Sequence, residues 1–232
     1  MSSSEQTTHV DPGVVIARER EDVAVGDEIV RHRRSSRLVH WAMALFFLVC
    51  LGSGMPIWTP VLGWMAGFFG GLEVCRWLHP WSGIVFVVST WLMFGQWKRD
   101  MRIEEVDKPW IGPRFLKYMA HSEGNEEVGK YNGGQKIFFW SAIVAALVMA
   151  ASGVVLWWPE QFSSGLRQAS ILVHELGFIY FACSVVLHIY FGTAAEPGTF
   201  RSMTRGTVTR AWARLHHPRW YREVTGEDAR KR

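Results

Sequence analysis

Four stretches of the chain are apolar over about 20 residues each, and polar or glycine-rich segments separate them. They cover residues 38–58, 78–97, 137–158 and 169–192. A helix of about 20 apolar residues crosses a hydrocarbon layer of about 30 Å. The pattern therefore predicts an all-α membrane protein built as a four-helix transmembrane bundle.

The segments outside these stretches divide the rest of the chain. Residues 59–77 are apolar but rich in glycine, which favours an interfacial segment over a further crossing. Residues 1–37 are polar and mixed in charge, and we expect a mostly mobile tail. The predicted organisation is an N-terminal extension (1–37), a membrane domain (38–192) and a C-terminal segment (193–232).

Composition supports a membrane protein and narrows its chemistry. Of the 232 residues, 49% are hydrophobic, and these residues are concentrated in the four stretches. The three cysteines form no CxxC or CxxCH motif, which argues against a disulfide framework and against covalent c-type haem attachment. Several of the 13 tryptophans lie near the ends of the stretches, where we expect them to anchor the protein at the membrane interfaces. These are Trp41, Trp58, Trp77, Trp81, Trp97, Trp157 and Trp158.

The distribution of basic residues predicts the orientation of the bundle. Of the 25 lysines and arginines, only Arg76 and Arg167 fall in the segments 59–77 and 159–168. Basic residues near the ends of spans are retained on the cytoplasmic side. We therefore expect a multi-pass protein of the bacterial inner membrane with both termini and the 98–136 loop in the cytoplasm. Residues 1–37 contain no apolar run of the length found in a usual signal peptide.

Four histidines lie near the ends of the predicted spans. His174 and His188 are 14 residues apart in the fourth span, which corresponds on a helix to about 21 Å and to an angular offset of about 40°. His40 opens the first span and His79 opens the second. With the predicted orientation, His79 and His174 share the outer depth, and His40 and His188 share the cytoplasmic depth.

Two imidazoles at one depth between helices are typical of axial ligands to a haem iron. The sequence therefore predicts two b-type haems. Three alternatives remain: interfacial histidines without a ligand, a zinc site with four converging ligands, and proton-relay histidines of a transporter. The other five histidines are predicted to lie on the solvated surface. These are His9, His32, His121, His216 and His217.

Several motifs resemble the cytochrome b556 (gamma) subunits of membrane-bound respiratory formate dehydrogenases, over about residues 37–224. The resemblance rests on His40-Trp41, Leu78-His79-Pro80, KYNGGQK at 130–136, His174, His188-Ile189-Tyr190, and HHPRWYRE at 216–223. The last two motifs of the polar segments, 130–136 and 216–223, are the most specific. Residues 1–36 lie outside the resemblance.

The resemblance implies a membrane subunit of a larger complex. A catalytic alpha subunit with molybdenum or tungsten oxidises formate outside the membrane, and an iron–sulfur beta subunit passes the electrons on. This chain would carry them through two haems to quinone (menaquinone or ubiquinone), so the complex is a formate:quinone oxidoreductase whose formate-oxidising residues lie in a partner subunit. The heterotrimer is expected to form a higher oligomer, in contact with membrane lipid and without nucleic acid.

The resemblance also implies roles for named residues. The haem ligands would be His79 with His174, and His40 with His188. Quinone would bind at the cytoplasmic side, next to His188, at Asn132, Gly134 and Gln135. Without the resemblance, the 130–136 motif is better interpreted as a turn that enters a helix.

Two other functions remain open at this point. A cytochrome b subunit of a hydrogenase, or of another molybdenum oxidoreductase, would use the same haem arrangement with a different outer partner. A non-redox membrane transporter, or a structural anchor, would carry the histidines without haem. A reduced-minus-oxidised visible spectrum separates the redox proteins from the second group.

Overall fold

The computed structural model describes residues 11–110 and 127–229 and contains the four predicted long helices. All four are long and apolar enough to cross a membrane, which confirms the prediction of four spans. They are α2 (Arg34–Trp58), α3 (Leu72–Trp97), α5 (Gly133–Trp157) and α6 (Ser164–Tyr190).

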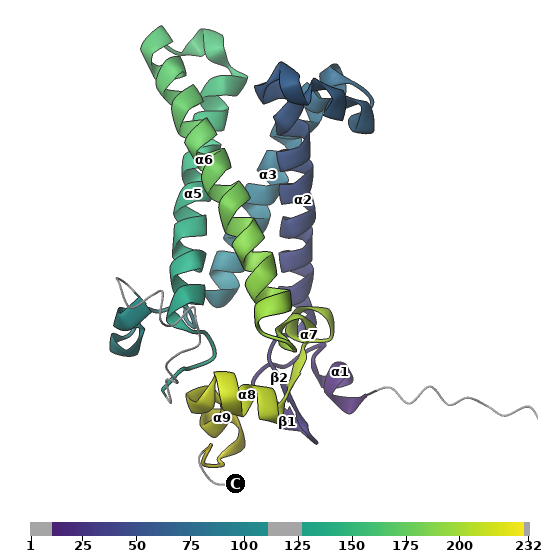
Figure 1. Ribbon diagram of the computed structural model, residues 1–232, viewed down its shortest axis with the longest axis vertical. Helices are drawn as coiled ribbons and strands as arrows, with labels where there is room; N and C mark the ends of the chain where they lie inside the picture. The colour runs from purple at the N-terminus through teal and green to yellow at the C-terminus, as the bar shows by residue number, and fades with distance from the viewer. Residues whose placement is uncertain (1–10, 111–126, 230–232) are drawn as a thin grey trace, which may run out of the picture.

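The helices form an elongated bundle in which α2 packs along α3 and α5 packs along α6 (Figure 1). Apolar side chains cover the outside of this bundle. Leu45, Val144 and Val186, from three different helices, are each more than half exposed. In water such a surface would be costly, whereas lipid tails accommodate it, so the exposed side chains agree with a membrane location.

Each helix begins earlier than its apolar stretch. The second span was predicted from residue 78, but α3 begins at Leu72; the fourth was predicted from residue 169, but α6 begins at Ser164. The Ser163 hydroxyl accepts a hydrogen bond from the backbone N–H of Leu166 and caps α6. Backbone hydrogen bonding therefore continues beyond the apolar residues into the polar interface.

Segment 59–77 contains no candidate span of its own, in agreement with the prediction, and its last residues belong to α3. Its first part is a short 3₁₀ helix, η1 (Pro60–Phe69), and the chain then turns at Gly70 and Gly71, which both have positive φ, into α3. A second short 3₁₀ helix, η3 (Pro159–Gln161), lies at the same end of the bundle (Figure 1). We call this end the η1 end.

At the opposite end of the bundle, residues 12–30 form regular structure. They contain α1 (Pro12–Ile16), β1 (Val23–Val25) and β2 (Glu28–Val30). The prediction of a mostly mobile tail is therefore wrong for the described part of this segment. Strands of three residues are too short for their apolar alternation to be recognised in the sequence.

The partner that stabilises this hairpin comes from the C-terminal segment. β3 (Thr207–Thr209) pairs antiparallel with β2, so that Ile29 lies opposite Val208, and the sheet order is β1-β2-β3. The other C-terminal elements are α7 (Thr199–Thr204), α8 (Arg210–His216) and α9 (Pro218–Thr225). A small core joins both ends of the chain: Ile29, Val208, Trp212, Ala213, Trp220 and Tyr221.

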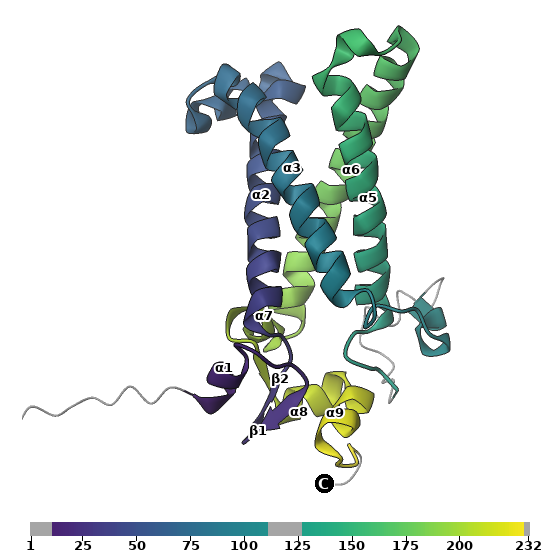
Figure 2. The same cartoon turned by 180° about the vertical axis from the view of Figure 1, so that it is seen from behind.

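The β-sheet and the C-terminal helices α7, α8 and α9 form a polar layer below the bundle, near the short 3₁₀ helix η2 (Glu105–Trp110) that follows α3 (Figure 2). We call it the sheet end. Both described ends of the chain lie there, as an even number of crossings requires. The molecule thus has an apolar bundle with a compact polar layer at one end only, within the described residues.

Candidate functional site

The four span histidines form two pairs at opposite ends of the bundle. At the η1 end, the imidazole of His79 in α3 faces that of His174 in α6, with 6.1 Å between ring centroids and 71° between ring planes. At the sheet end, His40 of α2 faces His188 of α6 with the same centroid distance and 46° between planes. The fold therefore brings together the two pairs that the depth argument predicted.

Hydrogen bonds behind the η1-end pair determine which ring nitrogen is free. Nδ1 of His79 lies 2.9 Å from the carbonyl oxygen of Cys50, which only accepts, so this nitrogen carries the proton. Nδ1 of His174 lies 2.9 Å from Oγ of Ser152. The Ser152 hydroxyl donates to the carbonyl of Val148 at 2.9 Å and thus accepts from His174. In both rings Nε2 keeps its lone pair.

This arrangement fits two axial ligands of one metal atom. A histidine that binds a metal through one ring nitrogen normally donates the other N–H to a carbonyl or a similar acceptor. A metal–nitrogen bond to imidazole is about 2 Å long, and the ring centroid lies about 1 Å beyond the nitrogen. Two imidazoles on opposite sides of one metal atom therefore have ring centroids about 6 Å apart. The measured 6.1 Å agrees with this value for both pairs.

A site with more ligands of the protein is not available in the described part of the chain. No group of three or more His, Cys, Asp or Glu side chains there could hold a metal ion. A structural zinc site needs four such ligands at one point. The donor set, two imidazoles at each of two depths, would fit a haem iron, because a porphyrin supplies the other four ligands itself.

A glycine lies beside each ring of the η1-end pair, and one of the two is required by the packing. A Cβ atom at Gly54 in α2 would lie 2.8 Å from Cε1 of His79, closer than real side chains approach. A Cβ atom at Gly153 in α5 would lie 3.5 Å from Cε1 of His174, in ordinary contact. Helix α2 can therefore pack against the His79 ring only because residue 54 lacks a side chain.

The sheet-end pair is positioned by aromatic packing. The ring of His188 stacks on Phe138 of α5 with 5.0 Å between centroids and 16° between planes. Nδ1 of His40 is buried and has no hydrogen-bond partner among the described residues. The neighbouring Trp41 lies edge-on to the His40 ring and donates through Nε1 to the carbonyl of Met203 at 3.0 Å, which ties this turn of α2 to α7.

The residues implied for quinone binding lie at the start of α5. Asn132 and Gln135 form a capping box: Asn132 Oδ1 accepts from the Gln135 N–H at 2.9 Å, and Gln135 Oε1 accepts from the Asn132 N–H at 3.1 Å. Both carbonyl oxygens are thus occupied, and no described residue accepts from either side-chain NH₂ group. Gly134 lies against the indole of Trp110, since a Cβ atom there would be 3.0 Å from Cε3.

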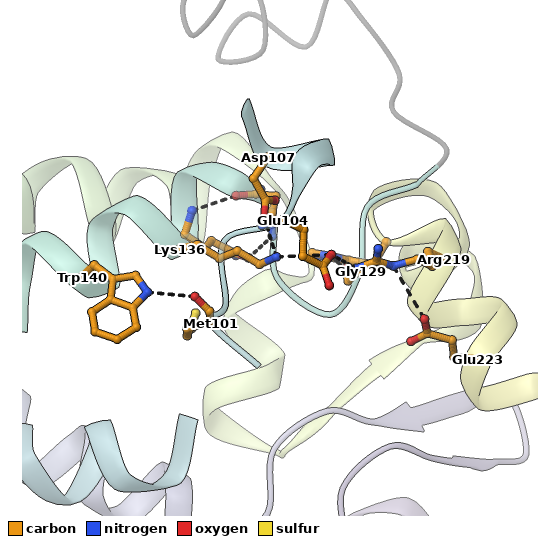
Figure 3. A network of polar contacts seen from close by, with 11 residues as sticks. Met101, Glu104, Asp107, Gly129, Lys136, Trp140, Arg219 and Glu223 are labelled. Carbon is orange, nitrogen blue, oxygen red and sulfur yellow. Dashed lines mark hydrogen bonds and ion pairs between the residues drawn. The ribbon is translucent and has the colours of Figure 1, made fainter. Parts of the chain in front are cut away.

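A polar network that the sequence did not predict holds this turn in place (Figure 3). Nζ of Lys136 lies 2.7 Å from Oδ2 of Asp107, and both side chains are buried. Glu104 is 3.8 Å from the same Nζ and also binds Arg219 of α9 at 2.6 Å. The start of α5 is therefore connected to η2 and to the C-terminal segment.

Two histidines that we predicted on the surface are buried instead. His217 is 1% exposed: its Nδ1 donates to the carbonyl of Gly129 at 2.6 Å, and its Nε2 lies 3.3 Å from Nη2 of Arg31. Burial and the neighbouring Arg31 keep the pKa of His217 well below its usual range. His32 is 3% exposed and its ring contacts those of Trp97 and Tyr131. Their segments are rich in charge but fold into the polar layer; His9 and His121 lie outside the described residues.

Comparisons with known proteins find a matching family model and several similar proteins. The family model for prokaryotic cytochrome b561 matches residues 31–206. The nitrate-inducible formate dehydrogenase cytochrome b556(Fdn) subunit of Escherichia coli K12 is 35% identical over 211 residues, which cover 88% of this chain and 94% of that protein. The formate dehydrogenase cytochrome b556(fdo) subunit of the same strain is 33% identical over 201 residues, or 85% and 94% of the two chains. The formate dehydrogenase cytochrome b556 subunit of Haemophilus influenzae is 28% identical over 206 residues, or 87% and 86%.

Proposed function

Because this chain belongs to the prokaryotic cytochrome b561 family, we propose that it is the membrane-embedded electron-transfer subunit of a formate dehydrogenase complex. Its partners are an iron–sulfur beta subunit and an outer alpha subunit in which molybdenum or tungsten oxidises formate. The observation that carries this proposal is the presence of two imidazole pairs, each with 6.1 Å between ring centroids, at opposite ends of one helix bundle.

Each pair holds one b-type haem in this proposal. When bound, a haem iron accepts one electron and gives it up again, so two haems connect the two membrane faces. The protein orients the ligands: the Cys50 carbonyl and the Ser152 hydroxyl hold the His79 and His174 rings with Nε2 free. Phe138 supports the His188 ring by stacking.

Quinone is reduced at the sheet end, which faces the cytoplasm. The distribution of basic residues supports this orientation, with both termini and the 98–136 loop inside. Asn132 and Gln135 lie less than two turns before Phe138, whose ring stacks on His188, and no described residue accepts a hydrogen bond from their NH₂ groups. These groups can donate hydrogen bonds to a quinone carbonyl. Gly134, the third residue implied for the quinone site, instead packs against the indole of Trp110.

Measurement of haem content tests the proposal. The purified wild-type complex is expected to give two haems per chain in a pyridine haemochrome assay. Replacement of His79 or His174 by alanine should remove one haem, and replacement of His40 or His188 should remove the other, with different spectral components lost. His216→Gln, outside the spans, serves as a control that keeps both. A wild-type ratio of zero or one haem would contradict the proposal.

A further inference from the structure

Three aromatic rings meet at the sheet end of the bundle without a role in the proposed haem or quinone sites. His32 lies just before α2, Trp97 ends α3, and Tyr131 lies just before α5. The His32 ring centroid is 5.3 Å from that of Trp97 and 6.0 Å from that of Tyr131, and the last two are 6.0 Å apart. Trp97, which we predicted as an interface anchor, is instead buried, like the other two.

Each of these rings carries a buried polar atom without a hydrogen-bond partner among the described residues. The atoms are Nδ1 of His32, Nε1 of Trp97 and the hydroxyl oxygen of Tyr131. The three side chains are 3%, 8% and 5% exposed. Native proteins leave few buried polar atoms unpaired, and one reason for such an atom is a bound water. Three such atoms on rings that contact one another therefore indicate a polar ligand at this cluster.

On the solvent side, this cluster borders an acidic group around Lys130. Nζ of Lys130 lies 2.7 Å from Glu21, 3.1 Å from Asp22 and 3.6 Å from Asp100. Burial raises the pKa of Asp100, and the carboxylates of Asp22 and Glu21 raise it further, although Lys130 opposes this. Asp100 is still partly exposed, so it can exchange protons with water. The next residue along the chain, Tyr131, leads from this group into the cluster.

On the inner side, the cluster borders the proposed quinone site, because Asn132 follows Tyr131 directly. Burial raises the pKa of Tyr131 well above its usual range. Burial, with the nearby charges of Arg31 and Lys130, lowers the pKa of His32 well below its usual range. Both side chains are therefore neutral near pH 7. A neutral phenol and a neutral imidazole each donate and accept a hydrogen bond.

We infer that His32, Trp97 and Tyr131 bind buried water, and that this hydrated cluster conducts protons from the carboxylates around Lys130 to the quinone beside Asn132. A buried water needs two to four polar partners, and the three rings supply three. The inference rests on the proposed function, which supplies the quinone and its electrons.

The reaction balances without a further reactant. A quinone takes up two electrons and two protons, and one O–H bond forms at each of its carbonyl oxygens. Each proton leaves an O–H or N–H bond of the cluster, which is restored by the next water and finally by bulk solvent. His32 and Tyr131 are unchanged after the turnover, so they act as relays.

The substitution Tyr131→Phe tests this inference in the intact complex. The hydroxyl has no partner in the described protein, so a purely structural role predicts no loss of function when it is removed. The inference predicts that quinone reduction by formate falls several-fold and that the ratio of rates in H₂O and D₂O rises. Haem content and formate oxidation by a dye that accepts electrons from the outer subunits should stay at wild-type values.

Tyr221→Phe is the matched control, because Tyr221 is equally buried but donates its hydroxyl proton to Glu227 outside the cluster. This variant should keep the wild-type rate and isotope ratio. Trp97→Phe removes the indole N–H and part of the ring, and it should behave like Tyr131→Phe. It also replaces the first test if that variant does not assemble.

The outcomes separate this inference from the proposed function. If the wild-type complex contains two haems and reduces quinone, but Tyr131→Phe keeps the wild-type rate and isotope ratio, the inference is wrong and the proposed function stands. If the wild-type complex binds no haem or does not reduce quinone, the proposed function itself fails. A structure of the wild-type complex that resolves ordered water gives a direct check: water bonded to the Tyr131 hydroxyl supports the inference, and a dry cluster overturns it.

Discussion

The η1-end pair of histidines is oriented by atoms that lie behind the rings. The Cys50 carbonyl behind His79 and the Ser152 hydroxyl behind His174 accept hydrogen bonds from the Nδ1–H groups. Nε2 of each ring therefore keeps its lone pair. Ser152 can do this because its own proton is directed to the backbone of α5. A small polar residue within an apolar span thus sets the tautomer of a histidine on the neighbouring helix.

Ser152→Ala is expected to weaken haem binding at the His79/His174 pair without abolishing it. The imidazole loses its acceptor but keeps its position, and loss of such a supporting contact typically lowers metal affinity by about 10–100-fold. The measurement is haem retention during washing with detergent, followed by difference spectra. Ser53→Ala is the matched control, because Ser53 is also buried but bonds only to the backbone of its own helix. Equal retention in both variants would contradict the role of Ser152.

At the scale of elements, the first turn of α5 combines several functions. Asn132 caps the helix, and Gly133 and Gly134 lie under the indole of Trp110. Lys136 binds Asp107 of η2 (Figure 3). A Cβ atom at Gly133 would lie 2.5 Å from the Trp110 ring, so glycine is required there by packing. This turn is therefore structural whether or not quinone binds to it.

Two substitutions of Asn132 separate capping from quinone binding. Asn132→Ala removes the cap, which should cost about 1 kcal/mol of stability, and also removes the NH₂ donor. Asn132→Asp keeps an oxygen that can accept from the Gln135 N–H, and a negative charge is favourable at a helix N-terminus, but it lacks the donor. Both variants are expected to reduce quinone several-fold more slowly, while only the alanine variant lowers the melting temperature.

The measurements are quinone and dye reduction by formate, together with thermal unfolding of the complex. Dye reduction and haem content should be unchanged in both variants. If Asn132→Asp retains wild-type quinone turnover and sensitivity to a quinone-analogue inhibitor, the side-chain NH₂ group does not bind quinone and the site lies elsewhere.

At the scale of the whole molecule, the two ends of the chain build one layer against the bundle. β2 pairs with β3, Glu28 forms an ion pair with Arg201, and Arg31 packs over the rings of Trp212 and Trp220. Arg31 also donates to the carbonyl of Lys130 at 2.6 Å. The layer thus fixes the loop that enters α5, next to the sheet-end histidines.

The orientation of this layer can be measured with reporter fusions. A reporter that is active only in the cytoplasm should give a signal after Arg232 and at Glu123, and none at Glu160 in the short loop between α5 and α6. A reporter that is active only outside should give the reverse pattern. The physical reason is the retention of basic residues inside. An outward signal after Arg232 would place the His40/His188 pair outside and exclude proton uptake from the cytoplasm at the sheet end.

Local properties of the sequence were sufficient to predict the membrane bundle. Apolar length identifies a span without knowledge of its neighbours, and this gave four spans and excluded a crossing at 59–77. Helical periodicity placed His174 and His188 on one face at two depths, and the alternation of spans predicted their partners. The structure has both pairs face to face. The depth of each histidine depends only on its position in its own span and on the order of the spans, and both can be read from the sequence.

The tertiary structure alone decided the polar end of the molecule and the contacts around the rings. Strands β1 and β2 are stabilised by β3 from the other end of the chain, so no local pattern predicted them. The same association buries His32 and His217, whose segments are charged and appear solvated in the sequence. The acceptor for His79 is a backbone carbonyl, which every residue has and no side-chain pattern reveals. Such features depend on which distant segments meet, and that is determined only when the chain folds.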